Sequence, residues 1–188
     1  MEDPIELHFE RDTDWYDWLL KNHNKEKSVY LIFYKLETNR PTMRWEEAVK
    51  VALCFGWIDS KVQSLGDGKR RQYFSPRKAN SNWSALNKKY IDELIATNLM
   101  QESGYKSIQI AKKSGTWTAM DAIEKGIVPN ALQDAFNQNP KAFENFNNFA
   151  KSYKKSYLTY LNSAKREATQ LKRINEIVKL CEANKKMR

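Results

Sequence analysis

The chain of 188 residues has few of the residues that build metal sites or disulfide frameworks, since it contains only two histidines and two cysteines. His8 and His23 lie in separate predicted elements with no accompanying carboxylate cluster, and we therefore predict no metal site. Cys54 and Cys181 lie in apolar helical patterns without a Cys-x-x-Cys spacing. We expect both to be buried free thiols in a reducing compartment.

Long apolar runs are also missing, because none approaches the roughly 18 residues that a membrane helix needs. The first four residues, Met-Glu-Asp-Pro, lack the basic and apolar regions of a secretory signal, and we expect a cytoplasmic protein. The sequence contains no GxxxxGK[ST], GxGxxG or GxSxG motif. These absences exclude the common nucleotide-binding loops and the hydrolase nucleophile elbow, and no cofactor is predicted.

Hydrophobic residues make up 41% of the chain and aromatic residues 12%, which is enough for a globular core. The net charge of +9 is unevenly distributed. Residues 1–60 hold 8 basic and 12 acidic residues, whereas residues 61–90 hold 8 and 1, and residues 151–188 hold 11 and 3. The two basic blocks either form a solvated surface or bind an anionic partner.

Hydrophobic patterning predicts strands at residues 5–9, 28–36, 57–65 and 70–75, with a hairpin turn at 66–68. Helical patterns follow Thr13 and Thr42, each for a single helix. After Ser84, helical patterns account for the rest of the chain. The predicted fold class is α+β, with a small antiparallel sheet in the N-terminal half packed with several helices and an all-helical C-terminal module. We expect a sheet-containing region at residues 1–100 and a helical module at 101–188, docked on the first.

The last predicted helix, residues 166–182, has a stripe of apolar side chains at helical spacing. We expect this helix to pack through the members of that stripe, which are Leu171, Ile174, Ile177, Val178 and Cys181.

Aromatic, basic and hydroxyl side chains are concentrated between residues 57 and 84, where a strand ends just before a helix begins. Exposed backbone amides at such a junction favour an anion. The sequence therefore predicts a ligand site, and its residues are Trp57, Asp59, Arg71, Arg77, Lys78, Trp83 and Ser84. Trp57 and Trp83 either stack on a ligand or pack the sheet. Asp59 is either a general base, which would make the protein an enzyme, or the partner of an arginine that orders the hairpin.

A nucleic-acid partner is the other hypothesis, because basic residues alternate with aromatic ones in both basic blocks. Its candidate residues are Arg70, Tyr73, Phe74, Lys154, Lys155 and Lys165. The sequence does not fix the oligomeric state.

Several short blocks resemble one family along nearly the whole chain. They are Glu47-Ala48-Val49, the segment 54–60 (CFGWIDS), the segment 74–78 (FSPRK), Trp83-Ser84 with Asn87, and in the C-terminal part the segments 152–157 (SYKKSY) and 164–169 (AKREAT). They are similar to blocks of the YdeI/OmdA family, described as bacteriocin-protection, YdeI or OmpD-associated proteins. The resemblance implies a link to envelope stress and antimicrobial-peptide resistance and specifies no reaction.

Overall fold

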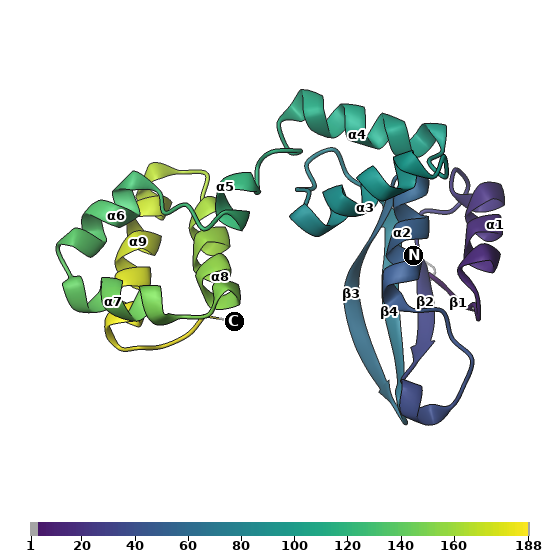
Figure 1. Cartoon of the computed structure of the whole chain (residues 1–188), viewed down its shortest axis with the longest axis horizontal. Coiled ribbons are helices and arrows are strands. Elements are labelled where there is room, and N and C mark those ends of the chain that lie inside the picture. The colour runs from purple at the N-terminus through teal and green to yellow at the C-terminus, as the bar shows by residue number, and fades with distance from the viewer. Residues whose placement is uncertain (1–3, 188) are drawn as a thin grey trace. The chain divides into compact units, whose positions relative to one another are not determined.

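The structure, a computed structural model, describes residues 4–187. Contacts divide the chain into two compact units, one up to Thr118 and one from Ala119 (Figure 1). The described elements of the first unit are β1 (Ile5–His8), α1 (Asp12–Asn22), β2 (Val29–Tyr34), the 3-10 helix η1 (Leu36–Thr38), α2 (Trp45–Cys54), β3 (Trp57–Gly66), β4 (Lys69–Pro76), α3 (Ala85–Ala96) and α4 (Glu102–Ser114). Those of the second unit are α5 (Asp121–Glu124), α6 (Asn130–Asn137), α7 (Pro140–Asn148), α8 (Lys151–Asn162) and α9 (Glu167–Glu182).

The four strands form one sheet in the order β1-β2-β4-β3. The pairs β2–β4 and β3–β4 are antiparallel, as predicted, but β1 pairs in parallel with β2. The sheet is therefore mixed, and the prediction of a wholly antiparallel sheet is wrong for β1. The physical reason is α1, which carries the chain back along the sheet so that β2 starts at the same end as β1.

The predicted hairpin between β3 and β4 is confirmed, and its turn is at Gly66, Asp67 and Gly68. All three residues have positive φ, at 81°, 46° and 70°, a backbone region that glycine adopts without steric cost. The register of this hairpin places Asp59 opposite Phe74. Because side chains alternate along a strand, Asp59 and Phe74 lie on one face of the sheet and Arg71 lies on the other.

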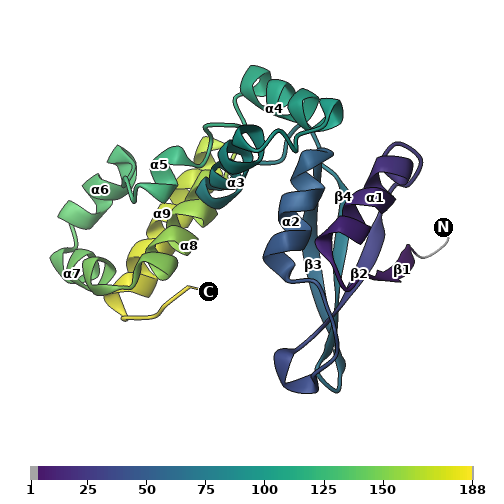
Figure 2. The ribbon, with the colours of Figure 1, turned by 45° about the vertical axis from the view of Figure 1, so that its right-hand side comes forward.

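One face of the sheet packs against α1 and α2, which the ribbon shows side by side along it (Figure 2). Trp15 of α1 is fully buried there, and its ring contacts the rings of Trp57 and Phe74 at centroid distances of 6.4 and 5.8 Å. The indole nitrogen of Trp15 donates to the Ala48 carbonyl of α2. This aromatic contact joins α1, α2 and the hairpin in one core.

Helix α4 also belongs to the first unit, because Gly104, Ile108 and Ala111 are buried, and Ile108 and Ala111 belong to the same hydrophobic core. The predicted boundary at residue 100 precedes this helix, whereas the division in the structure follows Thr118.

The second unit has its own core, built from the facing sides of α6, α7, α8 and α9. Ile174, Ile177 and Cys181 of α9 are buried in it, as predicted, and Val178 packs against it. Leu171 is 55% exposed, so its predicted place in this apolar face is wrong. It lies one turn before Ile174, and burial along α9 begins only at Ile174. Cys54 and Cys181 are both buried free thiols, which confirms that prediction.

Candidate functional site

The first unit contains a cleft of about 1490 Å³ beside the start of β3 and the end of β4. Its lining comes from Pro4, residues 23–27, Tyr30 of β2, Trp45 of α2, residues 55–61, most of residues 73–87, and one side of α4 from Ser103 to Ala111. The site is thus built from parts of the sequence that are up to about a hundred residues apart.

Gly56 determines how closely two of these segments approach. It follows α2 with a φ of +72°, and its carbonyl accepts a hydrogen bond from the Arg77 backbone amide at 2.9 Å. A β-carbon at residue 56 would lie 2.8 Å from the Ser103 carbonyl oxygen, closer than real contacts allow. Glycine at this position therefore lets the first turn of α4 close one side of the cleft.

Arg77 is held in a fixed position at the end of β4. Its guanidinium carbon lies 3.8 Å from the ring centroid of Trp83, and Nη1 donates to the Asn82 carbonyl at 3.3 Å. Burial lowers the pKa of Arg77 to about 10, although the negative charge of Asp59 acts in the opposite direction. The guanidinium is therefore a partly desolvated cation, for which an added anion would be a favourable partner.

Three buried side-chain polar atoms have no hydrogen-bond partner among residues 4–187, and all three belong to residues that line this cleft. They are Nε of Arg77, Nε1 of Trp83 and Oγ of Ser103. Leaving a buried donor unpaired costs roughly 1–3 kcal/mol. Buried polar atoms without a partner are uncommon in folded proteins, and their occurrence in the wall of this cleft makes it a candidate site.

The cleft is also rich in cations without ion-pair partners. Six basic residues line it, and within the described part of the chain none of them forms an ion pair: Lys25, Lys27, Lys61, Arg77, Lys78 and Lys106. Of the acidic residues between positions 4 and 187, only Glu26 and Asp59 are in the lining. By contrast, Lys50 and Arg71, outside the cleft, are both paired with glutamates.

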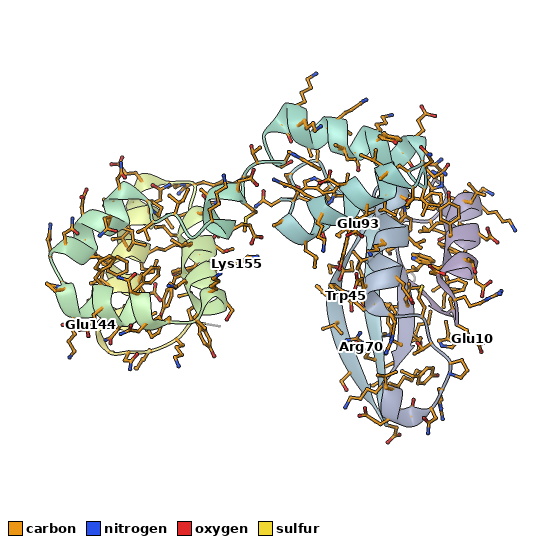
Figure 3. The ribbon with its side chains drawn as sticks, viewed as in Figure 1. Glu10, Trp45, Arg70, Glu93, Glu144 and Lys155 are labelled. Carbon is orange, nitrogen blue, oxygen red and sulfur yellow. The ribbon has the colours of Figure 1, made fainter. Side chains whose placement is uncertain are left out.

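Asp59 is held by neutral donors rather than by an arginine. It accepts a hydrogen bond from Nε1 of Trp45 at 2.9 Å and another from Nε2 of the buried Gln72. Trp45 is the first residue of α2, which lies next to the hairpin (Figure 3). Asp59 therefore joins β3 to β4 and to α2, and the predicted salt bridge with an arginine is not what orders the hairpin.

Six of the seven predicted ligand-site residues line the cleft, and only Arg71 lies elsewhere. Arg71 is on the opposite face of the sheet from Asp59, where Nη1 pairs with Glu6 at 2.5 Å and the guanidinium stacks on Tyr30. The reason is its place along β4, since Arg71 lies nearer the hairpin turn than Tyr73, which shares its face of the sheet and lines the cleft.

Three of the six have a structural part in the wall of the cleft. Trp57 and Trp83 are 1% and 0% exposed, so they pack the sheet and do not offer a ring face to a ligand. Ser84 caps α3, because its Oγ accepts from the Asn87 amide at 3.2 Å. This confirms the predicted helix start.

The cleft residues on α4 escaped the sequence prediction. Ser103, Lys106, Ser107 and Ile110 follow one another at i, i+3, i+4 and i+7, so they share one side of the helix, and all four line the cleft. The sequence signal that could have indicated this side of α4 is the spacing of its polar members, Ser103, Lys106 and Ser107. The position of this side next to the hairpin follows only from the packing of α4 against the end of α2.

The residues proposed for nucleic acid are distributed differently. Tyr73 is half-buried and lines the cleft, but Phe74 is fully buried in the core and cannot stack on a base, so that assignment is wrong. Arg70 is exposed beyond the cleft and stacks on Phe33 at 5.4 Å.

The other three are in the second unit, where Figure 3 labels Lys155. Lys155 pairs with Glu124 at 2.7 Å, and Lys154 donates to the Asn147 carbonyl. Lys165 is exposed.

The described residues form neither a metal-binding cluster nor a membrane-spanning helix. Among residues 4–187, no group of three or more histidine, cysteine, aspartate or glutamate side chains is placed to hold a metal ion. In the same range, no helix has the length and apolar character needed to cross a membrane.

Comparison with known proteins gives two matches to family models. Residues 7–107 match a family described as "Domain of unknown function (DUF8412)", and residues 125–184 match "Bacteriocin-protection, YdeI or OmpD-Associated". The blocks between residues 47 and 87 therefore lie in the first match, and the closing blocks from 152 to 169 in the second. No curated protein and no solved structure matches the chain.

Proposed function

We propose that the cleft of the first unit binds a small anionic or phosphorylated ligand. The chain belongs to the DUF8412 family through residues 7–107, and residues 125–184 match the bacteriocin-protection, YdeI- or OmpD-associated family. The observation that carries the proposal is a set of six cationic side chains in one cleft that form no ion pair with any residue the structure describes. Arg77 is the expected anchor, since its stacking on Trp83 and its bond to Asn82 fix the guanidinium in place.

The guanidinium of Arg77 suits an oxyanion in particular. Nη1 is engaged with a backbone carbonyl, and Nε is buried without an acceptor among the described residues. A guanidinium binds carboxylate or phosphate through its N–H groups, and we expect the anion to approach from the Nη side, because Nε is buried. Because the cation is already partly desolvated, the protein has already lost part of the hydration of Arg77 before the anion arrives.

The test replaces both adjacent cations at the strand end with neutral side chains of similar length, as Arg77→Gln together with Lys78→Gln. We expect phosphate and sulfate to raise the melting temperature of the wild-type protein and to have little effect on this variant, since two of the cleft's charges are lost. Differential scanning fluorimetry at constant ionic strength measures the shift.

Arg70→Gln with Lys35→Gln is the matched control, because it removes the same charge from residues outside the cleft. The control should respond to anions as the wild type does. Equal responses from all three proteins would refute the anion site.

We further propose that this binding serves resistance to antimicrobial peptides, which the description of the family matched by residues 125–184 supports. Cells that lack the protein should then be more sensitive to bacteriocins. Reintroducing the wild-type chain should restore survival, whereas the Arg77→Gln/Lys78→Gln variant should not, because the ligand no longer binds. Survival curves of the four strains at graded bacteriocin concentration provide the measurement, and unchanged sensitivity of the deletion strain would refute the link.

A further inference from the structure

A pair of tyrosines forms a different part of the same cleft. Tyr30 of β2 and Tyr73 of β4 are opposite one another in the antiparallel register, and both line the cleft. Their ring centroids lie 5.3 Å apart with an interplanar angle of 71°. Because their sequence neighbours Val29 and Phe74 are fully buried on the helix side, both tyrosines are on the other face of the sheet.

These rings are only partly used by the protein itself. Both are half-buried, and neither hydroxyl forms a hydrogen bond within residues 4–187. Arg71 stacks on Tyr30 at 4.3 Å and is in turn fixed by Glu6, so that Tyr30 is covered and immobilised. The ring of Tyr73 contacts only Tyr30 among the described aromatic and cationic groups. Tyr73 is therefore the ring that a ligand can reach on a rigid support.

The tyrosine pair and the cationic end of the cleft are connected along β4. Tyr73 precedes Arg77 by four residues, which corresponds to about 13 Å of extended chain. Ser75 lies between them and also lines the cleft. A bare phosphate ion at Arg77 would not reach Tyr73. A ligand that uses both features must carry an anion and a planar ring separated by a linking group.

We propose that the ligand is a nucleoside phosphate, either free or as part of a single-stranded nucleic acid, with its base against Tyr73 and a phosphate at Arg77. This inference rests on the proposed anion-binding function and assigns its ligand class. The chemistry matches, because every base has a flat face that stacks on an aromatic side chain, and stacking of this kind is tolerant of base identity. Lys27 and Lys61 line the cleft as well and supply charge for further phosphates.

The experiment measures binding to the full chain by isothermal titration calorimetry with adenosine 5′-monophosphate, ribose 5-phosphate, inorganic phosphate and a short single-stranded oligoadenylate. Adenosine monophosphate should bind roughly 5- to 100-fold more tightly than ribose 5-phosphate, because only the former has a base to stack. In Tyr73→Leu this preference should disappear while the affinity for inorganic phosphate stays unchanged.

Tyr34→Leu is the control, since Tyr34 shares the strand face of Tyr30 but does not line the cleft. It should retain the preference for the nucleotide. If wild-type protein binds phosphate but binds adenosine monophosphate no better than ribose 5-phosphate, the nucleoside inference is wrong and the anion site stands. If none of the probes binds, the proposed function itself is wrong.

The oligoadenylate distinguishes the two sources of nucleoside phosphate. Tighter binding than that of the mononucleotide, with a steep loss of affinity between about 50 and 200 mM salt, identifies a single strand as the ligand. Equal or weaker binding identifies the free nucleotide.

Discussion

Gly104→Ala is expected to destabilise the first unit by about 3 kcal/mol or more, although alanine ordinarily stabilises a helix relative to glycine. Gly104 lies in the first turn of α4, which packs against the end of α2. A β-carbon there would overlap the Cys54 carbonyl oxygen and would lie 2.7 Å from Cε of Met100. That carbonyl also accepts the Gln101 amide at 3.0 Å, so moving it away would strain the hydrogen bond that begins α4.

Urea unfolding followed by tryptophan fluorescence measures this loss selectively, because all six tryptophans lie before residue 118 and thus in the first unit. Gly66→Ala is the control, since nothing lies within 4 Å of a β-carbon there and the only cost is its positive φ. That control should lose about 1–2 kcal/mol. An unchanged or higher midpoint for Gly104→Ala would mean that the two helices do not pack this closely.

The hairpin shows what local sequence can predict. Turn chemistry at Gly66, Asp67 and Gly68 and alternation in the flanking strands are short-range signals, and the structure confirms both. Strand direction at β1 is a different matter. Four alternating residues indicate a strand but not its partner, and only the return path through α1 makes the pairing with β2 parallel.

The part of the candidate site that is formed by residues close in sequence could be predicted, and the part formed by distant segments could not. Residues between 57 and 84 are close in sequence, so a hairpin and a helix start bring most of them together. Arg71 lies outside the cleft because it is nearer the hairpin turn and is held by Glu6 and Tyr30, contacts between distant strands that the sequence does not reveal. Lys106 and Tyr30 were not predicted. Lys106 reaches the cleft because α4 packs beside it, and Tyr30 reaches it because β2 pairs with β4. The periodicity of a single sequence does not reveal such contacts between distant segments.

The two buried thiols should report separately on the unfolding of the two units, because Cys54 lies in the first and Cys181 in the second. Burial raises the pKa of Cys54 to about 12 and that of Cys181 to about 11, so that neither is a thiolate at pH 8 in the folded state. We expect both to react with a thiol reagent such as Ellman's reagent at least roughly a thousandfold more slowly than in unfolded chains, since reaction requires opening.

The pH dependence of stability has a definite sign. As pH rises above about 9, the unfolded chain loses its thiol protons before the folded one does. The two buried thiols therefore make their full contribution to the free energy of unfolding below about pH 9. This contribution is lost as the pH rises from there towards the pKa values of the thiols in the folded protein. Labelling at pH 8 avoids this loss and compares variants at constant protonation.

Destabilising one unit should then accelerate labelling at its own cysteine. A loss of about 3 kcal/mol in Gly104→Ala corresponds to a roughly 100-fold faster reaction of Cys54 when opening is in rapid equilibrium. Phe146→Ala, which removes a ring that is 2% exposed in the second core, should accelerate Cys181 at least as much, at a typical cost of about 3–5 kcal/mol. Each variant should leave the other cysteine at its wild-type rate, because the two cores share no residue among those described. Mass spectrometry of the labelled peptides separates the two sites, and parallel acceleration of both cysteines by either variant would show that the units unfold together.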